Sequence, residues 1–319
     1  MSNKVTVIGT GSVGSTIAYT LAVQGTVSEI VMIDVNTRKA LGEAMDIRQG
    51  TPFMNPCKIY AGSYEDAAGS DIVIVTSGIA RKPGQTRLEL CRINVNIIRS
   101  ITPQIVKYAP DAIYIFVSNP VDVLTYAFCK FSGLPESRII GSGTLLDSAR
   151  LRSRIAECLA ISQKDVHAFV LGEHGDSSFV PWNSVRISSL PLSAYRDHLN
   201  YRDDFSVELD LDDIENYIRT SGGKIIARKG ATFFAIAASV CDIVKNLLNG
   251  SDSVLCVSTM MHGEFGIEDV CLSIPTIVNG KGVKGTLLPE LTEDEITQLR
   301  HSAEVLKGVL AQIDFTESI

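Results

Sequence analysis

Residues 4–14 read KVTVIGTGSVG, a short β-branched run followed at once by three glycines in the pattern GxGxxG. The apolar run predicts a buried strand, and the residues after it predict a helix. In such a strand–turn–helix unit, Gly9 permits a tight turn and Gly11 lets the backbone approach a pyrophosphate. Gly14 lets the helix pack closely on the strand. The stretch therefore predicts the opening unit of a dinucleotide-binding fold.

Two further features favour NAD as the ligand of this unit. The first turn of the helix, at Ser12 and Val13, would offer free N–H groups and a partial positive charge to the phosphates. Asp34 ends the next predicted strand, 20 residues after Gly14. A carboxylate there suits the ribose hydroxyls and repels a 2′-phosphate, which favours NAD over NADP. S-adenosylmethionine is the minor alternative for such a fold.

The first half of the chain alternates short apolar runs with helical patterns, which predicts a parallel, doubly wound sheet. The runs are almost continuously apolar, as expected of strands covered on both faces. We expect strands at residues 5–8, 30–33, 59–61, 72–76, 113–117 and 139–141, and helices at residues 13–23, 38–49, 89–108 and 121–132.

The pattern changes after about residue 141. We expect longer helices at 145–159 and 212–249, strands at 166–171, 184–187, 254–259 and 270–278, and a last helix at 292–313. The last helix opens with the capping-box pattern of Thr292 and Glu295. The predicted fold class is thus α/β, with a Rossmann-type domain over residues 1–141 and an α+β substrate domain over residues 142–319. No linker marks the boundary, so we expect the two parts to pack closely.

Composition excludes several classes of function. The chain has 319 residues, with 29 Lys plus Arg against 36 Asp plus Glu and a formal charge of −7. That balance argues against non-specific nucleic-acid binding, which needs a basic face. The seven cysteines are an odd number without a CxxC pair, so we expect no disulfide framework and a reducing cytoplasm. No targeting segment and no membrane-spanning apolar run is apparent.

Several polar residues stand in places that suggest chemistry. Asn119 ends an apolar strand, Asp147 and Arg150 lie three apart on one predicted helix, and His174 lies in the turn LGEHGDS. Arg87 lies in ARKPGQTRLEL, a segment that could close as a lid over residues 78–90. Taken singly, each residue also fits an ordinary loop or surface role. We expect no metal site, because the sequence around His174 lacks HExxH and a second nearby histidine.

At this point the chain resembles a known family, the lactate and malate dehydrogenases, and within it the tetrameric branch that is similar to lactate dehydrogenases. The motifs GTGSVG, PGQTRLEL, SNPVDVLTY, IGSGTLLDSARLR, LGEHGDS and KGAT follow in the family's order and spacing, nearly from end to end. The resemblance implies an NAD-dependent L-2-hydroxy acid dehydrogenase and a homotetramer, or at least a dimer. A non-catalytic NAD-binding sensor would share the fingerprint but would not need the central polar residues.

The resemblance also implies a role for each of these residues. His174 would be the general acid/base, and Asp147 would orient its ring and stabilise the imidazolium. Arg150 would bind the substrate carboxylate through its planar fork. Arg87 would polarise the carbonyl in the closed site, and Asn119 would hold the reacting region and the ribose.

The choice of hydroxy acid rests on Arg81. In this family the residue just before KPG contacts the variable part of the substrate. Lactate dehydrogenases commonly carry glutamine there, whereas GIARKPG resembles the malate version. A cation about 4 Å from a second carboxylate is worth on the order of 4 kcal/mol at an effective dielectric of 20. We therefore expect oxaloacetate/L-malate as the substrate pair.

Pyruvate/L-lactate is the alternative, because other residues resemble lactate enzymes. Glu173 and Thr232 match them at places where malate enzymes of this branch usually have smaller residues. Arg152 and His167 match two positions at which bacterial lactate dehydrogenases bind fructose 1,6-bisphosphate. The resemblance therefore implies a possible allosteric site at those two residues, which also fit a plain helix surface and a strand.

Overall fold

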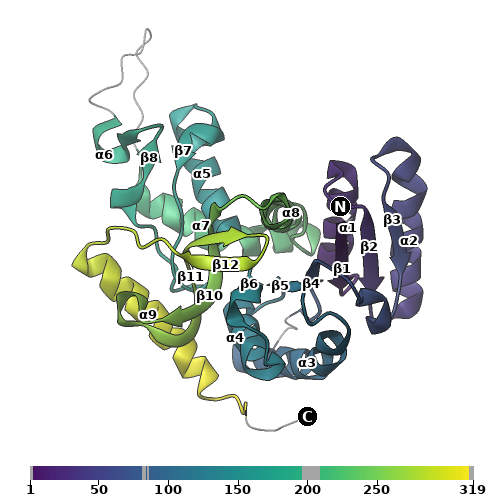
Figure 1. Ribbon diagram of the computed structural model, residues 1–319. Helices are drawn as coiled ribbons and strands as arrows, with labels where there is room; N and C mark the ends of the chain where they lie inside the picture. The colour runs from purple at the N-terminus through teal and green to yellow at the C-terminus, as the bar shows by residue number, and fades with distance from the viewer. Residues whose placement is uncertain (1–2, 81–83, 85, 196–208, 316–319) are drawn as a thin grey trace.

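The computed structural model describes residues 3–80, 84, 86–195 and 209–315. A nine-stranded sheet runs through it in the order β12-β11-β10-β6-β5-β4-β1-β2-β3, and a smaller sheet has the order β7-β8-β9 (Figure 1). The strands are β1 (Lys4–Ile8), β2 (Glu29–Ile33), β3 (Lys58–Ala61), β4 (Ile72–Val75), β5 (Ile113–Phe116), β6 (Ile139–Gly141), β7 (Val166–His167), β8 (Arg186–Ile187), β9 (Leu190–Pro191), β10 (Ser253–His262), β11 (Glu268–Asn279) and β12 (Gly282–Thr286).

The predicted parallel sheet is confirmed in the first half of the chain. Strands β3, β2, β1, β4, β5 and β6 pair in parallel in that order, the arrangement typical of dinucleotide-binding folds. The α-helices of the described residues are α1 (Ser12–Gln24), α2 (Thr37–Gly50), α3 (Arg87–Tyr108), α4 (Val121–Ser132), α5 (Leu145–Leu159), α6 (Leu192–Tyr195), α7 (Leu211–Lys229), α8 (Phe234–Asn249) and α9 (Glu293–Leu310).

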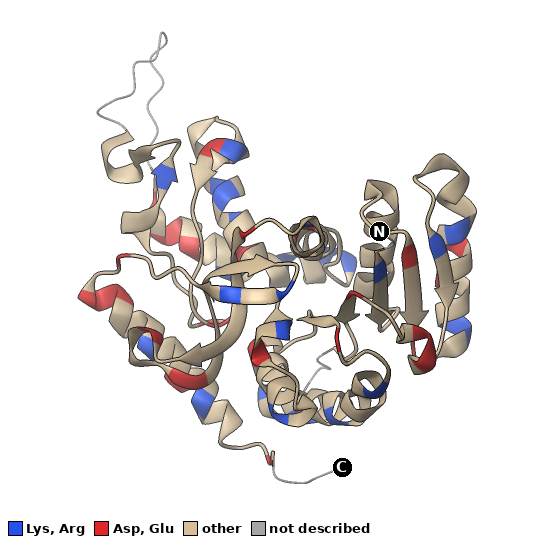
Figure 2. Ribbon diagram, in the orientation of Figure 1, with Lys and Arg blue, Asp and Glu red and all other residues tan. Residues whose placement is uncertain are grey.

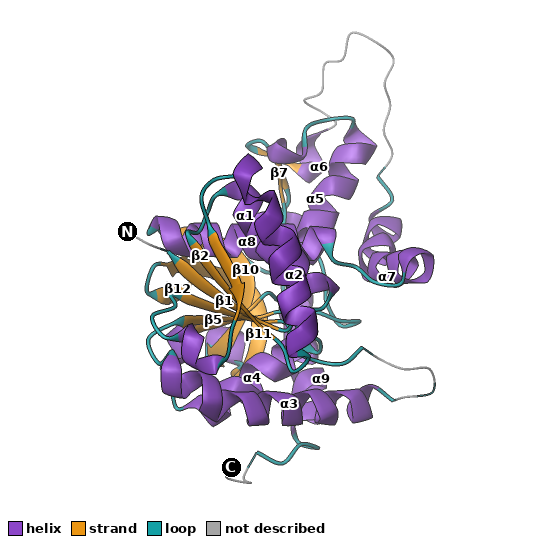
Figure 3. Ribbon diagram, turned by 90° about the vertical axis from the view of Figure 1, so that its right-hand side faces the viewer, coloured by secondary structure: helices purple, strands orange, loops and turns teal. Residues whose placement is uncertain are grey.

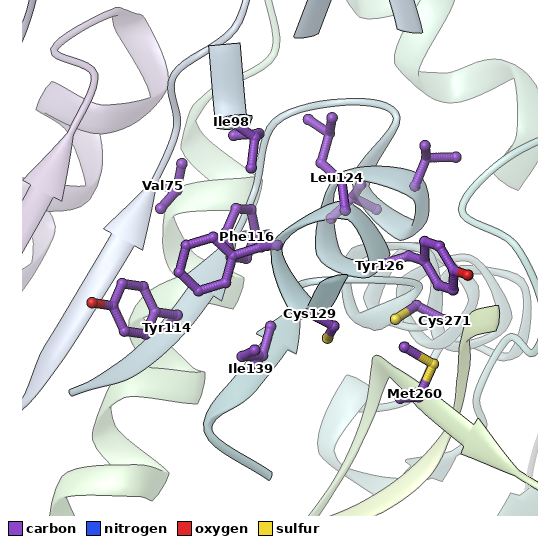
Figure 4. Packing of buried hydrophobic residues seen from close by; sticks show 14 of the residues in the cluster. Val75, Ile98, Tyr114, Phe116, Leu124, Tyr126, Cys129, Ile139, Met260 and Cys271 are labelled. Atoms are coloured by element: carbon purple, nitrogen blue, oxygen red, sulfur yellow. The ribbon is translucent and has the colours of Figure 1, made fainter. Parts of the chain in front are cut away.

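Helices cover both faces of the sheet (Figure 3), which explains why its central strands β4 and β5 are apolar throughout. Along β4, for example, Ile72 and Ile74 pack toward α1, α2 and α8, whereas Val73 and Val75 pack toward α3, α4 and α9. Figure 4 shows part of the core on the side of α3 and α4, where side chains of β4, β5 and β6 meet those of the two helices. Both faces of β4 are therefore covered by apolar side chains.

The sheet continues into the second half of the chain. Gly141 at the end of β6 pairs with Ser258 of β10, and β10, β11 and β12 then run antiparallel. The predicted boundary at residue 141 thus falls inside one continuous sheet, and the division into 1–141 and 142–319 stays a prediction. A third core lies between α5, α7 and the small sheet. In the view of Figure 2, acidic and basic residues are interspersed over the helices.

Two expectations about the second half were wrong. The expected single helix over 212–249 is two helices, because Gly230 adopts φ 84° and ends α7 before α8 begins at Phe234. The expected strand over 166–171 shrinks to β7, with an isolated bridge between Leu171 and Phe179. The capping box at Thr292 and Glu295 is confirmed at the start of α9. Within the described ranges, no helix is long and apolar enough to cross a membrane.

Candidate active site

A cavity of about 270 Å³ collects many of the polar residues that the sequence singled out. It opens beyond the carboxyl ends of β1, β5 and β6, where ligands bind in folds of this class. Segments from both halves of the chain line it, including α5, α7 and the start of α8. The predicted site residues among its lining are Val13, Asn119, Asp147, Arg150, His174 and Thr232.

Asp147 is the centre of a short chain of ionic hydrogen bonds. Its Oδ2 lies 2.5 Å from Nδ1 of His174, and its Oδ1 accepts a hydrogen bond of 2.8 Å from Arg150. Asp147 and Arg150 project from the same face of α5 because they are three residues apart. The carboxyl side chain of Asp147 is only 8% exposed, so this pair is not the ordinary surface ion pair that the spacing alone would allow. The contact to Nδ1 leaves Nε2 as the ring nitrogen available to a substrate.

Charge and burial set the protonation of this pair. Burial by itself lowers the pKa of His174, but the charge and hydrogen bond of Asp147, helped by the charge of Asp122, raise it to about 9. Burial alone would raise the pKa of Asp147, but the charges and hydrogen bonds of His174 and Arg150 lower the pKa of that carboxyl overall. The pair therefore holds a carboxylate and an imidazolium at neutral pH, which is the form able to donate a proton.

The glycine loop has the geometry that the fingerprint requires. Gly9 has φ 100°, and a side-chain Cβ at Gly14 would stand 1.9 Å from the carbonyl oxygen of Gly9. A Cβ at Gly11 would meet nothing within 4 Å, so the backbone there stays open to a ligand. Gly11 caps α1, whose first turn holds Ser12 and Val13. The loop thus fits a pyrophosphate at a helix N-terminus.

Asp34 has a structural contact as well as the expected ligand role. Its Oδ2 accepts hydrogen bonds from the backbone N–H and the hydroxyl of Thr10, at 2.6 and 3.1 Å. Burial alone would raise the pKa of Asp34, but these bonds and one from Asn36 lower it. The carboxylate is therefore charged and placed beside the glycine loop, where it fits the hydroxyls of an NAD ribose.

The remaining predicted residues lie outside the cavity. Arg87, the first residue of α3, forms an ion pair of 2.7 Å with Asp176 of the His174 turn, and both side chains are largely exposed. Arg152 on α5 and His167 on β7 are exposed. Arg81, like residues 82, 83 and 85 of the predicted lid, lies outside the described residues. Among the residues that are described, no three His, Cys, Asp or Glu side chains group in a way that could hold a metal ion.

The structure adds residues that the sequence analysis did not single out. Asn94 of α3 is 1% exposed; it accepts a hydrogen bond from the Ile79 N–H and donates one of 2.7 Å to the carbonyl of Asn119. It therefore links the start of the predicted lid to the cavity wall. Asp122 of α4 accepts a hydrogen bond from the backbone N–H of His174. Both are polar residues on otherwise buried helix faces, a signal that could have marked them, and Asp122 also lies in the motif SNPVDVLTY.

Comparison with known proteins agrees with this geometry. Residues 3–141 match the family described as lactate/malate dehydrogenase, NAD binding domain, and residues 144–315 match its alpha/beta C-terminal domain. An L-lactate dehydrogenase of Acetivibrio thermocellus is 42% identical over 311 residues, covering 98% of this chain and 97% of that protein. One of Clostridium botulinum is 45% identical over 311 residues, covering 97% and 96%.

Solved structures are similar over the same extent. A minor L-lactate dehydrogenase from Enterococcus mundtii, in a ligand-bound form, has a TM-score of 0.93 at 39% identity, covering 98% of this chain and 99% of that one. A lactate dehydrogenase from a Medee basin deep-sea metagenome library has a TM-score of 0.92 at the same identity and coverage. With the cavity, the glycine loop and matches to both halves of the family, the chain belongs to the lactate/malate dehydrogenases and is an NAD-dependent dehydrogenase of 2-hydroxy acids.

Proposed function

We propose that the cavity interconverts pyruvate and L-lactate, with His174 as the general acid in the reducing direction. The observation that carries the proposal is the 2.5 Å contact between Asp147 and Nδ1 of His174, which fixes the ring and leaves Nε2 for the substrate. A histidine held as imidazolium beside a buried carboxylate is suited to protonating a developing alkoxide. Bound NADH supplies the hydride for the carbonyl carbon.

The other residues of the site bind and orient the substrate. Arg150 uses one nitrogen on Asp147, which leaves further N–H groups of its fork for the substrate carboxylate. His174 Nε2 then donates its proton to the carbonyl oxygen, and Asp147 stabilises the ring before and after that transfer. In the oxidising direction the neutral ring takes the hydroxyl proton back. Arg87 lies beside the turn of His174, where it pairs with Asp176 at 2.7 Å, and we assign it the polarisation of the substrate carbonyl.

NAD would be held by the glycine loop and its neighbours. Gly11 and the first turn of α1 would receive the pyrophosphate, Asp34 the adenosine ribose, and Asn119 the ribose next to the nicotinamide. Gly9 and Gly14 keep the loop tight enough for these contacts, since neither position has room for a side chain.

Two observations bear on the substrate and they point in different directions. The relatives named L-lactate dehydrogenase match nearly the whole chain at 42–45% identity, and Thr232 lies in the cavity wall. Arg81 instead favours a second carboxylate, so oxaloacetate/L-malate is the second candidate. We place the similarity of the whole chain above a single residue of the loop, which reverses the expectation from Arg81.

Steady-state rates of NADH oxidation with the two oxo acids test this choice. We expect kcat/KM for pyruvate to exceed that for oxaloacetate by more than tenfold. A preference for oxaloacetate would overturn the proposal and return the assignment to malate. The variant Arg81→Gln adds a second comparison: it should cost oxaloacetate activity while leaving pyruvate activity intact or improved. If the ratio of the two activities stays constant, Arg81 does not contact the substrate.

Two properties of the assembly follow as further proposals. His167 lies opposite Arg186 in the small sheet, and Arg152 is exposed on the neighbouring helix α5. The positions of Arg152, His167 and Arg186 support a site for fructose 1,6-bisphosphate across a subunit interface of a homotetramer. Titrating that effector while following KM and oligomeric mass tests both proposals. A response that persists in Arg152→Ala would place the effector elsewhere.

A further inference from the structure

Consecutive backbone amides of the His174 turn are held by different elements of the fold. The N–H of Gly172 donates to a carbonyl of β11 at 3.0 Å, and the N–H of Glu173 donates to Ser302 Oγ of α9 at 2.7 Å. The N–H of His174 donates to Asp122 Oδ2 of α4 at 2.8 Å. The first two acceptors are neutral, and only the acceptor at His174 itself is a carboxyl group.

The surroundings of Asp122 make that choice of residue unusual. Its side chain is 3% exposed, and Oδ1 has no hydrogen-bond partner among the described residues. Ser258 faces it from β10 and lowers its pKa, although no hydrogen bond of ordinary geometry joins the two groups. A buried carboxyl with one unsatisfied oxygen is costly, and a neutral acceptor could hold the same N–H. Stability alone therefore does not account for an acid at this position.

We propose that Asp122 is a second carboxyl that acts on His174, a positioning residue which fixes the backbone of the turn and whose charge helps keep the proton on the ring. The inference rests on the proposed role of His174 as the general acid. Asp147 contacts the ring directly, whereas Asp122 acts from the backbone side. The two acids reach the same histidine from α5 and α4, on the two sides of residue 141.

The charges around the two residues support a role in proton affinity. Asp147 and Asp122 raise the pKa of His174, and Arg150 lowers it. Burial raises the pKa of Asp122 to about 6, with His174 lowering it and Glu173 raising it. Cys271 also faces Asp122, and its own raised pKa keeps it neutral. Between pH 6 and 9, Asp122 is therefore a carboxylate beside an imidazolium, the state needed for carbonyl reduction.

The variant Asp122→Asn tests the proposal, since it keeps the shape and an oxygen acceptor but removes the charge. The matched control is Asp269→Asn, which makes the same change of charge. Asp269 lies on β11 and pairs with Lys130 near the C-terminal end of α4, whereas Asp122 lies at the N-terminal end of that helix. Asp269 has φ 53°, a conformation that asparagine tolerates. The readout is the ¹⁵N shift of the His174 ring against pH in protein without substrate, with the pH profile of kcat/KM beside it.

We expect Asp122→Asn to lower the apparent pKa of His174 by about one unit or more, a usual effect of an adjacent charge. The alkaline limb of the reduction rate should move by the same amount, and Asp269→Asn should move neither. An unchanged titration in Asp122→Asn, or an equal shift in both variants, would overturn the proposal. A lower kcat with an unchanged pH profile would also overturn it, because that result assigns Asp122 a purely structural role.

A second measurement covers the case in which Asp122→Asn does not fold. In the unmodified protein, the backbone ¹⁵N–H of His174 should show an inflection near pH 6, when Asp122 takes up a proton, besides that of its own ring. If the backbone ¹⁵N–H of His174 shows only one inflection against pH, Asp122 and His174 are not coupled and the proposal is contradicted. Neither titration requires substrate or NADH. A protein inactive on both oxo acids would therefore refute the proposed function, whereas the titrations would still show whether Asp122 affects the proton affinity of His174.

Discussion

Replacing Asp147 with asparagine should move the working pH of the enzyme downward. The pKa of His174 is about 9 because Asp147 outweighs the effect of burial. Without that carboxylate, burial dominates, and the pKa should fall to about 6.5 or below. A fall of about 2.5 units corresponds to about 3 kcal/mol of preference for the protonated ring. At pH 7.5 the protonated fraction of His174 would then drop from nearly all to about one-tenth.

The assay is kcat/KM for the 2-oxo acid at saturating NADH, measured from pH 5.5 to 10. Reduction needs the imidazolium, so its rate should fall above about pH 9 in the unmodified enzyme and above about pH 6.5 in Asp147→Asn. The deficit of the variant should be at least about tenfold at pH 7.5 and should shrink toward pH 5.5. Binding of NADH serves as the control and should be unchanged. A variant that keeps its alkaline limb near pH 9, or that shows the same deficit at every pH, would refute the reasoning.

Further predictions concern the glycine loop and the lid. Gly14→Ala should destabilise the protein, because its Cβ would stand 1.9 Å from the Gly9 oxygen, whereas Gly11→Ala should melt normally yet bind NADH more weakly. Thermal unfolding and NADH titration distinguish the two effects. If both variants bind NADH as tightly as the unmodified protein, the loop is not part of the cofactor site. Arg87→Gln should change the unfolding free energy by less than about 1 kcal/mol, since its ion pair with Asp176 is exposed. It should nonetheless lower kcat by at least tenfold (about 1.4 kcal/mol) if Arg87 polarises the carbonyl. A normal kcat would mean that Arg87 serves only in the ion pair with Asp176.

The parallel half of the fold could be predicted closely from the sequence. Its strands are buried on both faces, so they stand out as short apolar runs, and the strand over residues 139–141 matches β6 at both ends. The second half was harder because helix periodicity does not show where a helix stops. Apolar side chains recur at helical spacing on both sides of Gly230, so the pattern continues across the break. In the structure the left-handed conformation of Gly230 ends α7, and residues 231–233 belong to neither helix. That break matters, since it places Thr232 in the cavity wall.

The candidate site divides in the same way. Asp147, Arg150 and His174 stand in family motifs, and the structure brings them within hydrogen-bond reach. Asn94 lies outside the family motifs. Asp122 lies inside one of them, SNPVDVLTY, but its contact with His174 is visible only in the fold, because the two residues lie on different segments. The expectation that Arg81 selects oxaloacetate concerns a residue outside the described ranges, and the similarity to lactate dehydrogenases favours the other substrate.

The central claim is that His174 donates the proton that accompanies hydride transfer. Single-turnover oxidation of bound NADH by the 2-oxo acid, followed in a stopped-flow instrument, tests it directly in His174→Gln. We expect this variant to bind NADH as before, because His174 lies in the substrate cavity, and to transfer hydride about 10²–10⁴ times more slowly across the pH range. A hydride-transfer rate within a few-fold of the unmodified enzyme would contradict the account.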